Sequence, residues 1–252
     1  MNEKVPFRTT ESLEQDSASL LKEYEDARGL VLKPPIPIED IIEKHLKLTI
    51  EFDDTHDIYK VPIPPNGERT ILGSIDHEGH IIIDVSLDPD DNPDQRGRYR
   101  FTLAHEGGGH WQLHQILLNE KVMQRSLFDN PSRPTARAII CRSTKKKPPH
   151  EWQADFYAAC LLMPREMIQA AWQERFPERE TPQGNSLSSP KIERRSVVED
   201  RDHFEEREEM ALNRLCKPLA DRFEVSFEAM RIRLQALGLL PCVTLQQQSF
   251  RF

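Results

Sequence analysis

Apolar residues in the first third of the chain change from helical spacing to strand spacing. Residues 12–28 and 37–46 carry helical patterns, and the second segment places three isoleucines on one stripe. Short runs rich in β-branched residues follow at 48–52, 70–75 and 80–85, with turn-forming proline, asparagine and glycine between them. This order predicts two structural helices followed by a small antiparallel sheet.

A longer helix is predicted after the sheet. Residues 91–94 read Asp-Asn-Pro-Asp, which supplies a capping residue, a proline for the first helical position and an acid for the first turn. We expect the helix to begin there and to run through His105. The chain reads A-H-E-G-G-G-H-W over residues 104–111, so this helix carries the most reactive group of side chains in the sequence.

Two further helices are predicted in the second half of the chain, at residues 151–162 and 165–176. Met163-Pro164 separates them, because proline cannot continue a helix. The preceding residues 115–149 contain proline-rich and lysine-rich stretches around the apolar run 138–141. We interpret residues 115–149 as a surface loop.

Changes in composition divide the chain into three parts. Residues 10–176 are expected to form one α+β domain, a small antiparallel sheet packed with helices. Residues 177–209 are rich in charge, proline and serine, which predicts a polar linker with the composition of a disordered segment. Residues 210–252 are expected to form a small helical module, with Ser226 capping its second helix and Gly238 ending it.

Composition and charge narrow the classes of function. The 252 residues are 37% hydrophobic, which is enough for one sizeable core and a smaller module. The formal charge of −8 provides no general attraction to nucleic acid or anionic lipid, so contact with either requires a local basic patch. The four cysteines form no C-x-x-C pair, which argues against a thiolate zinc site and a disulfide framework.

Neither a secretion signal nor a membrane span is predicted. The first residues of the chain lack an apolar run, and nowhere do 18 apolar residues follow one another. Scattered cysteines fit a reducing compartment. We therefore expect a cytoplasmic protein without membrane association.

The segment His105-Glu106-Gly107-Gly108-Gly109-His110 differs by one residue from the zinc-peptidase motif H-E-x-x-H. Two histidines four apart on an α-helix lie about 40° from eclipsed, whereas two that are five apart lie about 140° from each other. In a regular α-helix the pair His105 and His110 therefore cannot share a metal ion. The motif is either bent or broken.

A metal site with two histidines needs a third donor from elsewhere in the chain, because a catalytic zinc takes three protein ligands and a water. Glu151 is the candidate, at the start of the predicted helix 151–162. Asp155 lies one turn further on the same face, where it can accept the free N–H of a ligand histidine. Glu106 would then be the general base that activates a water.

Each of these residues also has a plain structural interpretation. An H-E pair near another histidine occurs by chance, and Glu151 with Asp155 is, taken alone, typical of a solvated helix face. We interpret His114 and His150 as packing or surface residues rather than as additional ligands.

Taken together, residues 100–114 and 151–164 resemble the ImmA/IrrE metallopeptidase family. Its members carry a segment like R-F-T-L-A-H-E-x-G-H-W-x-L-H and, later, E-x-x-A-(N/D)-x-F-A-x-x-L-L-M-P. The two segments together comprise about 30 residues, and the match is strong over this length. Residues 219–240 are also similar to the helix-turn-helix-type segment that follows the peptidase part in such proteins.

The resemblance implies a gluzincin-like zinc peptidase with a zincin-type active-site helix and one zinc per chain. His105, His110 and Glu151 would be the metal ligands, Glu106 the base and Asp155 the outer partner of a ligand histidine. Family members typically cleave a repressor that has its own helix-turn-helix, and so relieve repression in a stress response or after phage-related signals. A protein substrate of this kind is what the resemblance implies for this chain.

The extra glycine is the departure from the family pattern. A turn of π-helix, with about 4.4 residues, brings positions i and i+5 to within about 50° of each other, and such turns often lie at functional sites. Three helical glycines cost about 2.5–3 kcal/mol relative to alanine, while metal binding can contribute on the order of 10 kcal/mol. A bulged turn that aligns both histidines predicts an active enzyme. A regular helix means a lapsed site in a regulator that binds DNA or protein.

The C-terminal helices offer a rival function, DNA binding, through a second helix that carries Arg231 and Arg233. Residues 211–240 hold five basic and three acidic side chains, a net charge of +2, which allows few phosphate contacts. The alternative that we favour is a helical pair that packs on the catalytic domain or docks a partner protein.

Overall fold

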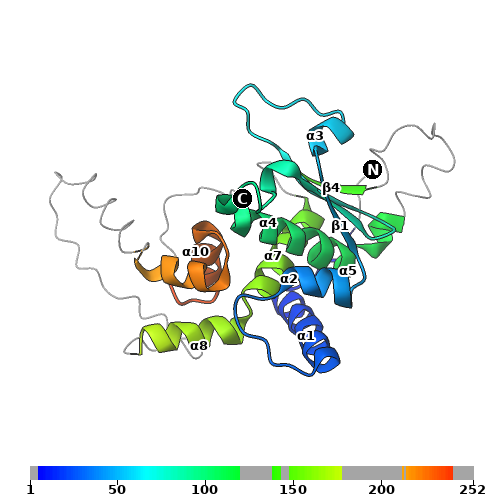
Figure 1. The fold of residues 1–252 in the computed structure, drawn as a ribbon. Coiled ribbons are helices and arrows are strands. Elements are labelled where there is room, and N and C mark those ends of the chain that lie inside the picture. Colours follow the sequence, from blue (N-terminus) through cyan, green and yellow to red (C-terminus); the bar gives the residue numbers. More distant parts are fainter. Residues whose placement is uncertain (1–4, 120–137, 143–147, 178–211, 213, 241–252) are drawn as a thin grey trace, which may run out of the picture.

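A computed structural model describes residues 5–119, 138–142, 148–177, 212 and 214–240 (Figure 1). These residues form a mixed structure of helices and one small sheet, and most of their buried apolar side chains belong to a single core. The α+β class expected from the sequence is confirmed.

The first helix, α1 (Thr10–Arg28), has the capping residues that its sequence predicts. The hydroxyl of Thr9 accepts a hydrogen bond from the backbone N–H of Ser12 at 3.2 Å, and Gly29 ends the helix in the left-handed region at φ 62°. Its buried side chains recur at helical spacing: Leu13, Ser17, Leu20, Leu21 and Tyr24. This stripe packs α1 against α7 (Pro149–Leu162).

The second predicted helix has a π-helical end. One turn of α-helix, α2 (Ile38–Asp40), continues into the π-helix η1 (Ile41–His45). Ile38, Ile41 and Ile42 are fully buried, as their stripe predicts.

The sheet contains four strands in the order β1-β3-β2-β4. Their bounds are β1 (Thr49–Asp53), β2 (Ile71–Asp76), β3 (His80–Asp84) and β4 (Ala138–Arg142). A short helix, α3 (Thr55–Ile58), lies in the connection from β1 to β2. The strands β2 and β3 form the hairpin that the turn residues predict.

The expectation of a purely antiparallel sheet is corrected at one pairing, because β1 runs parallel to β3. After β1, the connection at residues 54–70 does not place β2 next to β1, but leaves room for one strand between them. The β2–β3 hairpin then folds back and inserts β3 between β1 and β2. Because β1 and β2 run in opposite directions, β3, which is antiparallel to β2, runs parallel to β1.

The interpretation of residues 115–149 as a loop is corrected for β4, which pairs antiparallel with β2. The apolar run 138–141 that appeared isolated in the sequence is therefore the fourth strand. A short apolar run between loops does not by itself distinguish a buried strand from a surface segment. Residues 120–137 and 143–147 lie outside the described part of the chain.

The long helix begins with the 3-10 turn η3 (Pro93–Gln95), so proline occupies the first position, as predicted. It continues as α4 (Arg96–Leu103), the π-helix η4 (Ala104–His110) and α5 (Trp111–Leu113). A further 3-10 turn, η2 (Val85–Leu87), precedes it. Figure 1 shows this helix between the sheet on one side and α7 on the other, and the packing contacts agree.

The C-terminal helices pack into the same core as the rest of the molecule. Residues 214–223 are helical, and α10 (Phe227–Ala236) follows, capped by Ser226, whose hydroxyl accepts from the N–H of Ala229 at 3.2 Å. Gly238 follows this helix at φ 71°, so both predicted capping residues are confirmed. The core side chains of this region include Cys216, Leu219, Phe223, Met230 and Leu234.

A buried arginine joins α10 to two other elements. The side chain of Arg233 is 2% exposed, donates to the carbonyl of Met163 at 3.0 Å and pairs with Glu14 of α1 at 2.6 Å. Met163 lies between α7 and α8 (Arg165–Arg175). Arg233 therefore connects the C-terminal helices directly to α1 and to the junction between α7 and α8.

The domain division at residues 177 and 210 stays a prediction, because residues 178–211 lie outside the described part of the chain. Among the helices that the structure does describe, none has the length and apolar character needed to cross a bilayer.

Arg233→Met should lower the free energy of unfolding by about 2–4 kcal/mol, because it leaves the carbonyl of Met163 and one oxygen of Glu14 buried without their donor. Arg231→Met on the same helix is the control, because Arg231 pairs with the exposed Glu228 and its loss should cost less than about 1 kcal/mol. Urea unfolding measures both. Equal costs would show that the buried contacts of Arg233 do not hold α10 in place.

Candidate metal centre

The π-helix η4 brings His105 and His110 together. Their ring centroids are 4.6 Å apart and the ring planes lie at 82° to each other. In an α-helix, side chains five positions apart point in widely different directions, whereas the wider π-turn returns them to one face. Of the two alternatives that the sequence left open, the bulged turn is therefore present, and the helix is not regular here.

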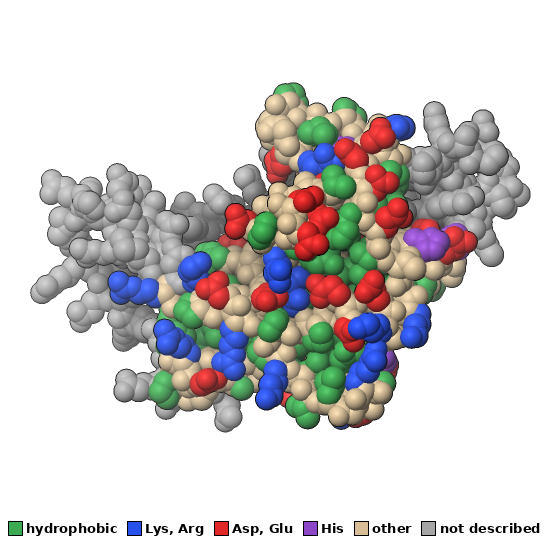
Figure 2. Space-filling model, in the orientation of Figure 1, with side chains coloured by type: hydrophobic (Ala, Val, Ile, Leu, Met, Phe, Trp, Pro, Cys, Tyr) green, Lys and Arg blue, Asp and Glu red, His purple; other side chains and the backbone are tan. Residues whose placement is uncertain are grey.

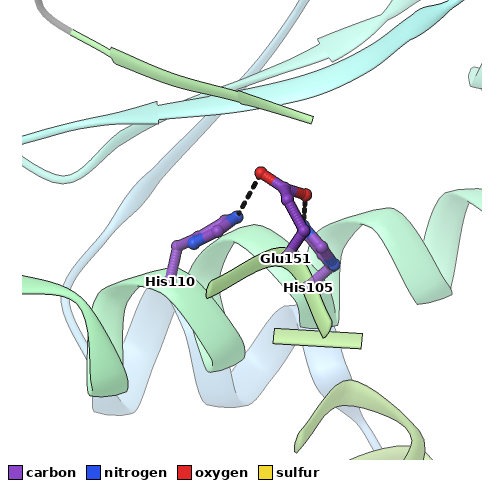
Figure 3. A group of neighbouring side chains, drawn as sticks. All are labelled: His105, His110 and Glu151. Atoms are coloured by element: carbon purple, nitrogen blue, oxygen red, sulfur yellow. Dashed lines mark ion pairs between the residues drawn. The ribbon is translucent and has the colours of Figure 1, made fainter. Parts of the chain in front are cut away.

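The third predicted donor comes from α7. The carboxylate of Glu151 lies 3.3 Å from Nε2 of His105 and 3.5 Å from Nε2 of His110, so one oxygen faces each ring (Figure 3). One donor atom from each of the three residues lies within 4.8 Å of the other two. Residues 105, 110 and 151, far apart in sequence, thus form one convergent group of donors.

The donor group is buried. His105, His110 and Glu151 are 1%, 0% and 5% exposed. Among the described residues, Nε2 of His110 and Oε2 of Glu151 are buried and have no hydrogen-bond partner. A buried polar atom without a partner is costly, and a cation between these atoms would satisfy both. Two imidazoles and one carboxylate are a ligand set that a catalytic zinc takes, with a fourth position open.

The surroundings favour the protonation states that metal binding requires. Burial lowers the pKa of His110 from 6.5 to about 3, so its ring is neutral at pH 7. Burial alone would raise the pKa of Glu151, but contacts with His105, His110 and His150 outweigh it and hold that pKa far below its usual range. The site therefore offers a neutral ring at His110 and an ionised carboxylate at Glu151.

Asp155 lies where the sequence predicts it, one turn along α7 from Glu151. Its Oδ1 is 3.0 Å from Nδ1 of His105. A carboxylate at Nδ1 favours the tautomer with the proton on that nitrogen, which leaves the Nε2 lone pair for a metal.

Glu106 lies within the π-helix next to His105 and is fully buried. Its carboxylate packs against β2 at Gly73, where an added Cβ would lie 3.2 Å from Oε1 of Glu106. The absence of a side chain at residue 73 thus makes room for this carboxylate between the helix and the sheet.

One contact of His110 and one contact of His114 were not predicted. Nδ1 of His110 lies 2.9 Å from Nδ1 of His114, and Nε2 of His114 lies 3.1 Å from Oε1 of Gln153. Both partners are buried, whereas the sequence interpretation had placed His114 among packing or surface residues. The four-residue spacing from His110 could have indicated His114. Nothing in the sequence marks Gln153.

His150 is also largely buried, and its Nε2 lies 3.5 Å from Oε1 of Glu151. Its ring centroid is 6.0 Å from those of His110 and His114. It is therefore a neighbour of the donor group rather than a surface residue, although it is not one of the three converging donors.

The three glycines allow η4 to approach its neighbours closely. A Cβ at Gly107 would lie 2.5 Å from Cδ1 of Ile42, and one at Gly108 would lie 2.8 Å from Cδ2 of Leu161. A Cβ at Gly109 would lie 2.7 Å from Cα of Ala154, so here the backbones of η4 and α7 are nearly in contact.

The family model described as the IrrE N-terminal-like domain, peptidase family M78, matches residues 90–235. The matched segment is more than half of the chain and contains the three converging donors together with Glu106 and Asp155.

No curated protein matches the sequence. Among solved structures, a Mycobacterium tuberculosis transcriptional regulator is similar, with a TM-score of 0.39 and 16% sequence identity. The similarity covers 95% of this chain and 48% of the regulator, so the chain spans about half the length of that protein.

Gly109→Ala should lower the free energy of unfolding by about 1–3 kcal/mol, because the new Cβ meets backbone atoms of Ala154. This loss comes despite the roughly 1 kcal/mol by which alanine favours a helix over glycine. Gly108→Ala is the control, since its Cβ meets the movable end of Leu161 and the change should stay within about 1 kcal/mol. Urea unfolding of the metal-free proteins compares them. Equal stabilities of the two variants would contradict the conclusion that the backbone contact at Gly109 excludes a side chain there.

Proposed function

We propose that this chain, which belongs to the M78 peptidase family of IrrE N-terminal-like domains, is a zinc-dependent endopeptidase that cleaves a partner protein. The family is one of metallopeptidases. The observation that carries the proposal is the convergence of His105, His110 and Glu151 despite the five-residue spacing of the histidines. A ligand set that had lapsed would have no reason to keep this convergence.

His105, His110 and Glu151 would hold one zinc ion per chain, and Asp155 would orient His105. When bound, zinc acts as a Lewis acid that polarises a peptide carbonyl and lowers the pKa of a water to about 7. Glu106 takes the proton of the attacking water as general base and then delivers it to the amine of the departing peptide. Its burial beside Gly73 holds the carboxylate in one place for both transfers.

The proposed substrate is a transcriptional repressor with a helix-turn-helix of its own. This substrate class rests on the resemblance of residues 100–114 and 151–164 to the ImmA/IrrE family. Cleavage would take place in the cytoplasm, and it would relieve repression in response to stress.

DNA binding by the C-terminal helices is the less supported alternative. Arg233 of α10 is buried in contacts with Met163 and Glu14, so it is not available to a phosphate. On the face drawn in Figure 2, lysine and arginine side chains are interspersed with acidic ones instead of forming one basic surface. Few phosphate contacts follow from this arrangement.

Glu106→Gln should lower the rate of repressor cleavage by about 10²- to 10⁴-fold, because the amide cannot accept the proton. Zinc content should stay unchanged, since Glu106 is not among the proposed ligands. Gel analysis of a purified repressor, with metal content measured in parallel, gives both quantities. Retained cleavage would remove Glu106 from the base role. A salt-dependent shift of promoter DNA, equal in wild type and variant and without cleavage, would favour the regulator alternative.

Zinc content should be one ion per wild-type chain and near zero for His110→Ala, because the variant removes one of three ligands. His45→Ala is the control, since His45 lies in η1, outside both groups of described side chains that could hold a metal ion, and should not affect the stoichiometry. Metal analysis after dialysis measures all three proteins. A wild-type value near zero under zinc-replete conditions would support the lapsed-site interpretation instead.

A further inference from the structure

A chain of three hydrogen bonds, two of them buried and the last partly buried, runs from His110 to the N-terminal segment. Nδ1 of His110 contacts Nδ1 of His114 at 2.9 Å, Nε2 of His114 contacts Oε1 of Gln153 at 3.1 Å, and the amide nitrogen of Gln153 donates to the carbonyl of Pro6 at 2.9 Å. The three side chains are 0%, 1% and 2% exposed. The chain of contacts therefore crosses the core from His110 and ends at the surface, where Pro6 is exposed.

The direction of these bonds follows from the far end. A backbone carbonyl only accepts, so the NH₂ group of Gln153 faces Pro6 and its oxygen faces His114. That oxygen also only accepts, so Nε2 of His114 carries a proton. A neutral imidazole has one N–H, which makes Nδ1 of His114 an acceptor. Nδ1 of His110 must then be the donor.

The consequence reaches the proposed metal site. If Nδ1 of His110 carries the proton, its Nε2 holds a free lone pair, and that nitrogen faces Glu151 at 3.5 Å. We propose that His114, held by Gln153 and the carbonyl of Pro6, is a positioning residue that fixes His110 in its metal-binding tautomer. This inference rests on the proposed function, because it assigns a purpose to the outer contacts of that site.

The two histidine ligands are thereby oriented by different chemistry. His105 faces the carboxylate of Asp155, whereas His110 faces a neutral ring backed by an amide. A neutral relay adds no further negative charge to those of Glu151 and Asp155, so the site is less negative than it would be with a second outer carboxylate. His114 lies on the turn after the glycines, where its backbone N–H donates to the carbonyl of His110 at 2.9 Å. The positioning residue thus moves together with the ligand that it orients.

Two substitutions of His114 separate positioning from packing. In His114→Asn the amide oxygen takes the place of Nδ1 and still accepts from His110, so zinc affinity should stay within about threefold of wild type. In His114→Leu no acceptor remains, and affinity should fall by about 10- to 100-fold. Competition with a chromophoric zinc chelator measures both values in the full chain. A packing role predicts the reverse order, because leucine fills a buried site better than asparagine, and that order would overturn the inference.

The tautomers can be read without metal. Two-bond ¹⁵N–¹H spectra of the histidine rings in the metal-free protein should show the proton of His110 on Nδ1 and that of His114 on Nε2. The opposite tautomer at His110 would overturn the inference even if zinc binds normally. If the wild-type protein shows the expected tautomers but binds no zinc, the proposed function is contradicted. The hydrogen-bonded chain from His110 to Pro6 would still be supported.

Discussion

The close approach of η4 to α7 is the constraint on which the rest of the site depends. Every side chain of the proposed metal centre comes from one of these two helices, so their separation decides whether the donors converge. At Gly109 and Ala154 the two backbones are nearly in contact, and any side chain at residue 109 would force them apart. The glycines therefore have two effects: they permit the π-helical turn, and they permit the approach that brings Glu151 to both histidines.

This arrangement concentrates polar groups in the core. The ionised Glu151 and the fully buried Glu106 lie among side chains that water does not reach. Burying charged groups costs free energy unless their partners satisfy them. These carboxylates therefore lower the stability of the fold unless they are paired. Binding of a cation to the folded state alone shifts the folding equilibrium toward that state. Stability and metal content of this protein are therefore linked through the same few atoms.

Local signals in the sequence predicted the parts of the fold that local chemistry decides. Pro93 begins the helix that carries His105, Ser226 caps α10 and Gly238 ends it, each for a reason that acts within one turn. The donor group was predicted because motif spacing and residue type are both readable from the sequence. The parallel pairing of β1 with β3 was not, because it depends on where the chain goes between residues 54 and 70. Gln153 was missed for the same reason, since only the packing of α7 brings it to His114.

The π-turn also explains how one additional residue leaves the rest of the site intact. In a regular α-helix, an added residue rotates everything after it by about 100°, so contacts before and after the addition cannot both be kept. A π-turn takes up the residue within a single wider turn, and the following helix keeps its phase. Both sets of contacts are present: His105 meets Asp155 at the start of η4, and His114 meets Gln153 after η4 ends. Since both partners lie on α7, the wider turn keeps η4 in register with α7 along its whole length, and this register places Nε2 of His105 and of His110 on the same carboxylate.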